Sequence, residues 1–174
     1  MTKLEQHLSN YAAYHLDRKN IITHFIGVPL IVFSILCLTG KFSLNISDYS
    51  INIALVLIIL SCIYYFRLNW IFALIMAILY IWIYPYAVEV SNLPSLSWLA
   101  VSIGLFVIGW IFQFVGHAFE GKKPAFFDDI RGLIIGPLFV LAEFIFILGF
   151  RKQLAESIQH YARIQREKMD QLES

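Results

Sequence analysis

The sequence predicts an all-α protein: a polytopic membrane helix bundle with four to five transmembrane helices and an N-terminal amphipathic helix. Three observations lead to this prediction. Of the 174 residues, 59% are hydrophobic, and the mean hydropathy is +0.71. Only 14% are charged, against roughly 25% in soluble domains, so charges are too few to cover a surface in water. The apolar residues also gather in runs long enough to cross a bilayer.

The N-terminal segment, residues 3–15, has the pattern of a short amphipathic helix. Leu4, Leu8, Tyr11 and His15 recur at steps of three to four residues and therefore share one helical face. We expect this helix to lie on the membrane surface or to cover the bundle.

Four apolar segments are predicted to span the membrane, over residues 21–38, 51–66, 70–88 and 98–115, the last continuing as helix toward Glu120. Eighteen residues at about 1.5 Å each give roughly 27 Å, just enough for the hydrocarbon core. Asn20 precedes the first span and suits a helix N-cap. A polar loop over residues 41–50, a tight turn over 67–69 and a loop over 89–97 connect the spans.

The last apolar stretch, residues 130–150, contains Gly136-Pro137 near its middle. Proline lacks a backbone donor and clashes with the preceding turn, so a break or kink is expected there. The stretch is either re-entrant, which fits the charge distribution better, or a full span, which fits its length better. Residues 1–150 are predicted to form one integral-membrane catalytic domain, and residues 151–174 a charged, helical, solvated tail.

Positive charge predicts the orientation, because cytoplasmic loops are enriched in lysine and arginine. The cations on the predicted cytoplasmic side are Lys3, Arg18, Lys19, Arg67, Lys122, Lys123 and Arg131. The opposite loops contain Lys41 only. The formal net charge of +1 gives no indication of nucleic-acid binding. The short, compact chain suits a bacterial inner membrane better than an endoplasmic reticulum.

Three histidines lie at the ends of apolar runs. His24 begins the first span on the cytoplasmic side, and His117 ends the fourth span, which returns to that side. Span counting therefore places both at one membrane face. On one continuous helix His15 and His24 would point about 180° apart and lie about 13 Å apart along the axis, so a shared ion requires a turn over residues 16–20. Gly116 would let another helix approach closely.

Imidazole is a common metal ligand, and ionisable groups at membrane depth are functional candidates. The residues alone leave a metal site and three interfacial, hydrogen-bonding histidines about equally supported. Gln113 and Glu120 share a helical face with His117. Glu120 is either a fourth ligand or an acceptor for an imidazole N–H. Glu143 is either a structural partner of the Gly136-Pro137 break or a buried acid near the metal. Lys123 is either a positive-inside charge or a group that holds a substrate carboxylate.

These residues resemble a family of 2-hydroxy fatty acid dioxygenases, formerly a domain of unknown function, whose characterised fungal members lie in the endoplasmic reticulum. In chain order the resemblance rests on Tyr14, His15, Asn20, His24, Gly27, Pro29, Gln113, Gly116, His117, Phe119, Glu120, Pro124, Ala125, Gly136, Pro137 and Glu143. It extends up to Phe150 and leaves out the charged tail.

The resemblance implies an enzyme that uses Fe2+ and O2 to shorten a 2-hydroxy fatty acid by one carbon, an α-oxidation. It implies His15, His24 and His117 as the iron ligands and adds Asn20 and Gln113 to the candidate site. Glu120 or Glu143 would take the hydroxyl proton, and Lys123 would offset the substrate carboxylate. The acyl chain of such a substrate dissolves in membrane lipid, and its polar head would lie at the headgroup level with the histidines.

Two other functions fit the same residues. A non-catalytic lipid-binding or assembly protein would contain no bound transition metal. A zinc-dependent lipid hydrolase would use the same ligands, because imidazole also binds zinc, and would act without O2.

Overall fold

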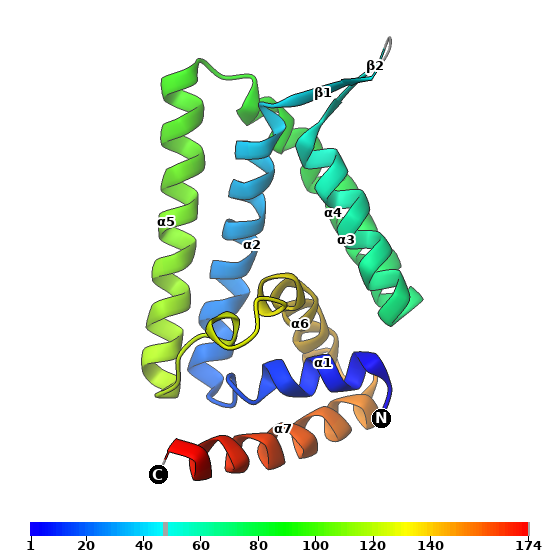
Figure 1. The fold of residues 1–174 in the computed structure, drawn as a ribbon, viewed down its shortest axis with the longest axis vertical. Coiled ribbons are helices and arrows are strands. Elements are labelled where there is room, and N and C mark those ends of the chain that lie inside the picture. Colours follow the sequence, from blue (N-terminus) through cyan, green and yellow to red (C-terminus); the bar gives the residue numbers. More distant parts are fainter. Residues whose placement is uncertain (47–48, 174) are drawn as a thin grey trace. The chain divides into compact units, whose positions relative to one another are not determined.

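The structure is a computed structural model that describes residues 1–46 and 49–173 (Figure 1). Its elements are α1 (Lys3–Ala12), α2 (Arg18–Gly40), β1 (Ser43–Ile46), β2 (Tyr49–Asn52), α3 (Ile53–Leu68), α4 (Trp70–Ser91), α5 (Ser95–Glu120), the short 3₁₀ helix η1 (Ala125–Phe127), α6 (Gly132–Ile147) and α7 (Lys152–Glu173). Nearly all of the regular structure is helical, which confirms the predicted fold class.

The described chain forms two compact units, one made of residues 1–26 and 112–174 and the other of residues 27–111. Helices α2 and α5 each contribute one end to each unit. The tail helix α7 falls within the first unit together with α1 and α6.

In the second unit, α3 and α4 pack side by side and are joined by Asn69 alone. The Asn69 side chain accepts hydrogen bonds from the amides of Ile71 and Phe72, at 3.0 and 3.3 Å, and so caps the start of α4. The tight turn predicted over residues 67–69 is present but shorter, because Arg67 and Leu68 still belong to α3.

The loop predicted over residues 41–50 is partly wrong, because β1 and β2 form an antiparallel hairpin there; its residues 47–48 lie outside the described structure. Ile51 pairs with Leu44 in this ladder, so the second apolar helix cannot begin at residue 51. It begins at Ile53, where the Asn52 side chain accepts the amide of Leu55 at 2.9 Å and caps the helix.

Three helices are long and apolar enough to cross a membrane: α2 with 23 residues, α4 with 22 and α5 with 26. The apolar helices α3 and α6 have 16 residues each, about 24 Å at 1.5 Å per residue, which is short of a core of about 30 Å. The predicted four to five spans therefore correspond to three long apolar helices and two shorter ones. The loop expected over residues 89–97 is reduced to residues 92–94, since α4 continues to Ser91 and α5 begins at Ser95.

Helix α6 is continuous from Gly132 to Ile147 with Pro137 inside it, so the chain does not break at Gly136-Pro137, and a kink there stays a prediction. Because α6 begins only at Gly132, Pro137 lies in its second turn, and its missing donor removes one hydrogen bond near a helix end. Gly136 has a packing role instead: a Cβ there would lie 3.0 Å from the hydroxyl oxygen of Tyr11. Whether α6 crosses the membrane or re-enters it stays a prediction.

In the first unit, α1 confirms the predicted amphipathic helix, with Leu4, Leu8 and Tyr11 buried. It packs against α6 and α7. The predicted tail helix is present as α7, but it is not wholly solvated: Ile158 and Ala162, one turn apart, are buried. The apolar face of α7 thus covers α1, while its charged residues are largely exposed.

Candidate metal centre

The three predicted histidines meet in the first unit. His15 follows α1, His24 lies in α2 and His117 lies near the end of α5. One ring nitrogen of each lies within 4.8 Å of the others, and the ring centroids are 4.4 to 5.1 Å apart. The three side chains are only 2%, 1% and 6% exposed. The convergence expected from span counting is confirmed.

A turn between α1 and α2 brings His15 back to His24. Helix α1 ends at Ala12, and α2 begins at Arg18, so the turn occupies residues 13–17, slightly before the expected position. Asp17 Oδ1 accepts the amide of Lys19 at 2.6 Å and is positioned as an N-cap. Asn20 is the third residue of α2, so its predicted capping role is wrong. An aspartate caps a helix as well as an asparagine does, and the Asn20 side chain has other partners.

The orientations of two imidazoles are set by main-chain carbonyls. His15 Nδ1 lies 2.7 Å from the carbonyl oxygen of Tyr11, and His24 Nδ1 lies 2.9 Å from that of Asn20. A carbonyl can only accept, so we assign the proton to Nδ1 in both rings. The lone pairs of the two Nε2 atoms then face each other at 3.0 Å. With both protons on Nδ1, a cation between the two nitrogens would stabilise this contact.

A proton is a poor candidate for that cation. Burial holds the pKa of His15 well below its ordinary value, and the neighbouring imidazoles of His24 and His117 lower it further. At neutral pH the imidazole of His15 is therefore neutral. A divalent metal ion would satisfy the facing lone pairs without protonating either ring.

The donor set fits a transition metal. Two nitrogens that bind one ion at about 2.0–2.1 Å lie about 2.9–3.4 Å apart, and the Nε2 atoms of His15 and His24 are 3.0 Å apart. Among the described residues, Nδ1 of His117 is buried without a hydrogen-bond partner. Neutral imidazoles suit zinc, copper, iron and nickel, and three of them leave coordination positions for other ligands.

Glu120 is bound by three donors. Its Oε2 accepts the amide of Asp17 at 2.7 Å and Nδ2 of Asn20 at 3.1 Å, and its Oε1 accepts Nη2 of Arg166 at 2.9 Å. The Nδ1 protons of His15 and His24 go to main-chain carbonyls instead. Through its hydrogen bonds to Asp17 and Asn20, Glu120 stabilises the turn before α2, a role that the sequence did not predict.

Asn20 and Gln113 each bring an unpaired polar atom to this region. Asn20 Nδ2 donates to the carbonyl of Tyr14 at 3.2 Å as well as to Glu120. Its Oδ1, and Nε2 of Gln113, are buried without a partner among the described residues. Gly116 makes the close helix contact possible, as predicted, because a Cβ there would collide with Thr23 Oγ1 and Asn20 Oδ1.

Lys123 and Glu143 make no described contact with the three histidines. Lys123 Nζ pairs with Asp128 Oδ1 at 2.6 Å, and more than half of the lysine side chain is exposed. Asp128 Oδ2 also accepts the Tyr14 hydroxyl at 2.8 Å, and both contacts lower the pKa of Asp128. Glu143 is half-buried one turn after Phe139, whose ring centroid lies 5.4 Å from that of His15.

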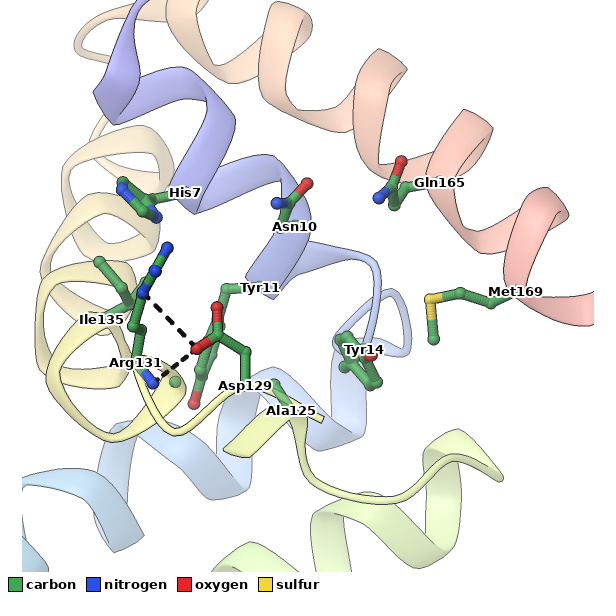
Figure 2. A pocket seen from close by; sticks show the side chains of 11 residues that line it. His7, Asn10, Tyr11, Tyr14, Ala125, Asp129, Arg131, Ile135, Gln165 and Met169 are labelled. Carbon is green, nitrogen blue, oxygen red and sulfur yellow. Dashed lines mark hydrogen bonds and ion pairs between the residues drawn. The ribbon is translucent and has the colours of Figure 1, made fainter. Parts of the chain in front are cut away.

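A cavity of about 170 Å³ lies in the first unit, against Tyr11 (Figure 2). It is lined by His7, Asn10, Tyr11, Tyr14, Ala125, Asp129, Arg131, Gly132, Ile135, Gln165 and Met169. None of the three clustered histidines lines it, so it is separate from the candidate metal site. Tyr11 connects the two, because its ring stacks on that of His15 with centroids 4.3 Å apart and planes 5° apart.

Sequence reasoning missed two residues of this region. Tyr11 carried a usable signal, since it lies four residues before His15 on the same predicted helical face. Arg166 carried none: it lies 46 residues after Glu120, in a segment without apolar spans.

Comparison with known proteins gives a family match and a curated relative. The model of the family described as "2-hydroxy-palmitic acid dioxygenase Mpo1-like" matches residues 1–148. The chain is 33% identical over 163 residues to the "2-hydroxy-palmitic acid dioxygenase MPO1" of Saccharomyces cerevisiae, an alignment that covers 90% of this chain and 88% of the yeast protein. No solved structure matches the chain.

Proposed function

The chain belongs to the Mpo1-like family of 2-hydroxy-palmitic acid dioxygenases, and from this premise we propose that it is an Fe2+-dependent dioxygenase of 2-hydroxy fatty acids. The proposed reaction shortens the acid by one carbon. It balances when one 2-hydroxy acid and one O2 yield the shorter acid, CO2 and water. The observation that carries the proposal is the cluster of three buried histidines with facing ring nitrogens.

His15, His24 and His117 are the proposed iron ligands. Bound ferrous iron would supply the one-electron chemistry that lets O2 react with an organic acid. The protein contributes neutral imidazoles held by the carbonyls of Tyr11 and Asn20. Burial excludes bulk water from the three rings.

Unpaired polar atoms near the histidines suit the head of the proposed substrate. Asn20 Oδ1 can accept a hydrogen bond from the 2-hydroxyl, and Gln113 Nε2 can donate one to the carboxylate. Of the two proposed proton acceptors, Glu143 is favoured over Glu120, whose oxygens already accept three hydrogen bonds. Lys123 would have to leave Asp128 to offset the substrate carboxylate.

The proposed location is a membrane, with the acyl chain in lipid and the site at the cytoplasmic face. Three long apolar helices support the membrane location. The distribution of lysine and arginine supports the orientation. The bacterial inner membrane remains the proposed compartment on chain compactness, and the yeast relative does not distinguish it from an endoplasmic reticulum.

The test combines metal analysis with turnover. Protein purified without oxygen is analysed for iron and zinc and then supplied with O2 and 2-hydroxypalmitate labelled with ¹³C at C1. The proposal expects about one equivalent of iron, oxygen uptake and labelled CO2. Protein without metal that releases no CO2 would indicate a lipid-binding or assembly role. Zinc-loaded protein that cleaves lipid esters without O2 would indicate a hydrolase.

A further inference from the structure

We propose that Arg166, from the tail helix α7, is a positioning residue of the metal centre. Its guanidinium donates to the carbonyl of Ala13 and, through Nη2, to both the carbonyl and the side chain of Glu120. These acceptors belong to the two chain segments that carry His15 and His117. The inference rests on the proposed function for the identity of the metal, but not for the contacts.

The acceptors in both segments lie two or three residues from a histidine of the candidate site. Ala13 precedes His15 by two residues, and Glu120 follows His117 by three, on the same helical face. Glu120 in turn accepts the amide of Asp17 and the side-chain amide of Asn20. The carbonyl of Asn20 holds Nδ1 of His24. Arg166 thus connects to all three ligand positions without touching a ring.

The charges make this contact selective for arginine. The Glu120 side chain is 2% exposed and that of Arg166 is 16% exposed. A buried carboxylate needs a compensating cation, and loss of the cation leaves the charge uncompensated. Only the planar fork of arginine can reach two carbonyls and a carboxylate at once, whereas lysine offers one point charge.

Helix α7 is held where Arg166 can reach the site. It packs against α1, and Ile158 and Ala162 on its apolar face are buried. Near its end, Asp170 accepts Nζ of Lys122 at 2.8 Å and lies 3.6 Å from Nε of Arg166. The match to the family model ends at residue 148, before this helix begins. The tail therefore supplies a contact that the matched region does not contain.

The experiment compares Arg166→Gln and Arg166→Lys with Arg163→Gln, a change of an exposed arginine on the same helix. Two measurements avoid turnover: the hydrogen-exchange rate of residues 13–20, and the affinity for Co2+ titrated into metal-free protein. Arg166→Gln should speed exchange at the Asp17 amide and weaken Co2+ binding about 10- to 100-fold, as expected for loss of an outer partner of metal ligands. Arg166→Lys should give an intermediate loss, and Arg163→Gln none.

Turnover adds a third readout. Positioning predicts that Arg166→Gln lowers kcat more than it raises KM, since substrate does not touch the arginine. Wild-type exchange at Asp17 together with wild-type Co2+ affinity in Arg166→Gln would overturn the inference. If Arg166→Gln does not fold, Arg166→Lys alone decides, by the same two measurements. If the wild-type protein binds no metal, the proposed function fails, and exchange at residues 13–20 still tests the contact.

Discussion

The unit formed by residues 1–26 and 112–174 and the unit formed by residues 27–111 bury different kinds of polar group. Among the described residues, the first buries Ser9, His15, Asn20, His24, Gln113, His117 and Glu120, and the second buries only serines: Ser34, Ser91 and Ser102. Two of these serines bond to a carbonyl three residues back in their own helix. In the first unit, Glu120 accepts from partners 46 and about 100 residues away.

This difference indicates that the first unit contains the candidate site and that the second unit is mainly structural. A buried polar group is tolerated when it is hydrogen-bonded, and Ser34 and Ser91 bond within their own helices, whereas Ser102 Oγ is buried without a partner among the described residues. A buried carboxylate beside three imidazoles needs partners from several segments, which forces those segments together. The first unit therefore carries the candidate site, and the second consists mainly of apolar helices joined by short connections.

The largest expected effect comes from removing a proposed ligand. His15→Ala, His24→Ala and His117→Ala should each lower bound iron and turnover by about 100-fold or more, because a three-imidazole site loses a third of its donors. His160→Ala, which changes an exposed histidine of α7, is the matched control and should behave as wild type. Elemental analysis and oxygen uptake measure both quantities. Normal iron content and turnover in all three ligand variants would disprove the metal centre.

Two glycines of α5 test the contrast between the units within one helix. Gly116→Ala should destabilise the fold by about 1–3 kcal/mol through overpacking against Thr23 and Asn20. It should also reduce iron binding. In the second unit, a Cβ at Gly104 meets nothing within 4 Å, so Gly104→Ala should stabilise the protein by about 0.4–1 kcal/mol. Unfolding in detergent measures both changes, and equal effects would contradict the contrast.

A helix cap in the second unit should affect stability alone. Asn69→Ala removes the acceptor of the Ile71 and Phe72 amides and should cost about 1 kcal/mol of unfolding free energy. Iron affinity and kcat should stay unchanged, because the described contacts of Asn69 lie within its own unit. If Asn69→Ala also lowers the iron affinity of the folded protein, the two units are coupled.

The smallest expected effect lies at the edge of the first unit. Lys123 and Tyr14 lower the folded-state pKa of Asp128, so their stabilisation is present above the unfolded pKa of about 3.9 and is lost as the pH falls through the folded pKa. The contacts are largely exposed, which limits the contribution to below about 0.5 kcal/mol. Denaturant titrations of wild type and Asp128→Asn between pH 6 and pH 3 measure it. A larger difference would place Asp128 among the buried contacts of the unit.

The sequence by itself was sufficient for the features that depend on local pattern. Apolar runs predicted the helices, and the spacing of Leu4, Leu8 and Tyr11 predicted α1. Because His15 and His24 are nine positions apart, a shared ion required a turn between them. Span counting brought His24 and His117 to one face because each crossing reverses the chain. These features follow from helix period and length, which any single segment reveals.

Other features depended on which segments meet. Helix α6 begins only five residues before Pro137, and the helix continues through this proline. Asp17 rather than Asn20 caps α2. The Asn20 side chain donates a hydrogen bond to Glu120, and Glu120 accepts another from Arg166 of the tail. Only the tertiary structure decided these contacts, because a buried carboxylate takes its donors from whatever segments pack around it, and contacts across tens of residues leave no period in the sequence.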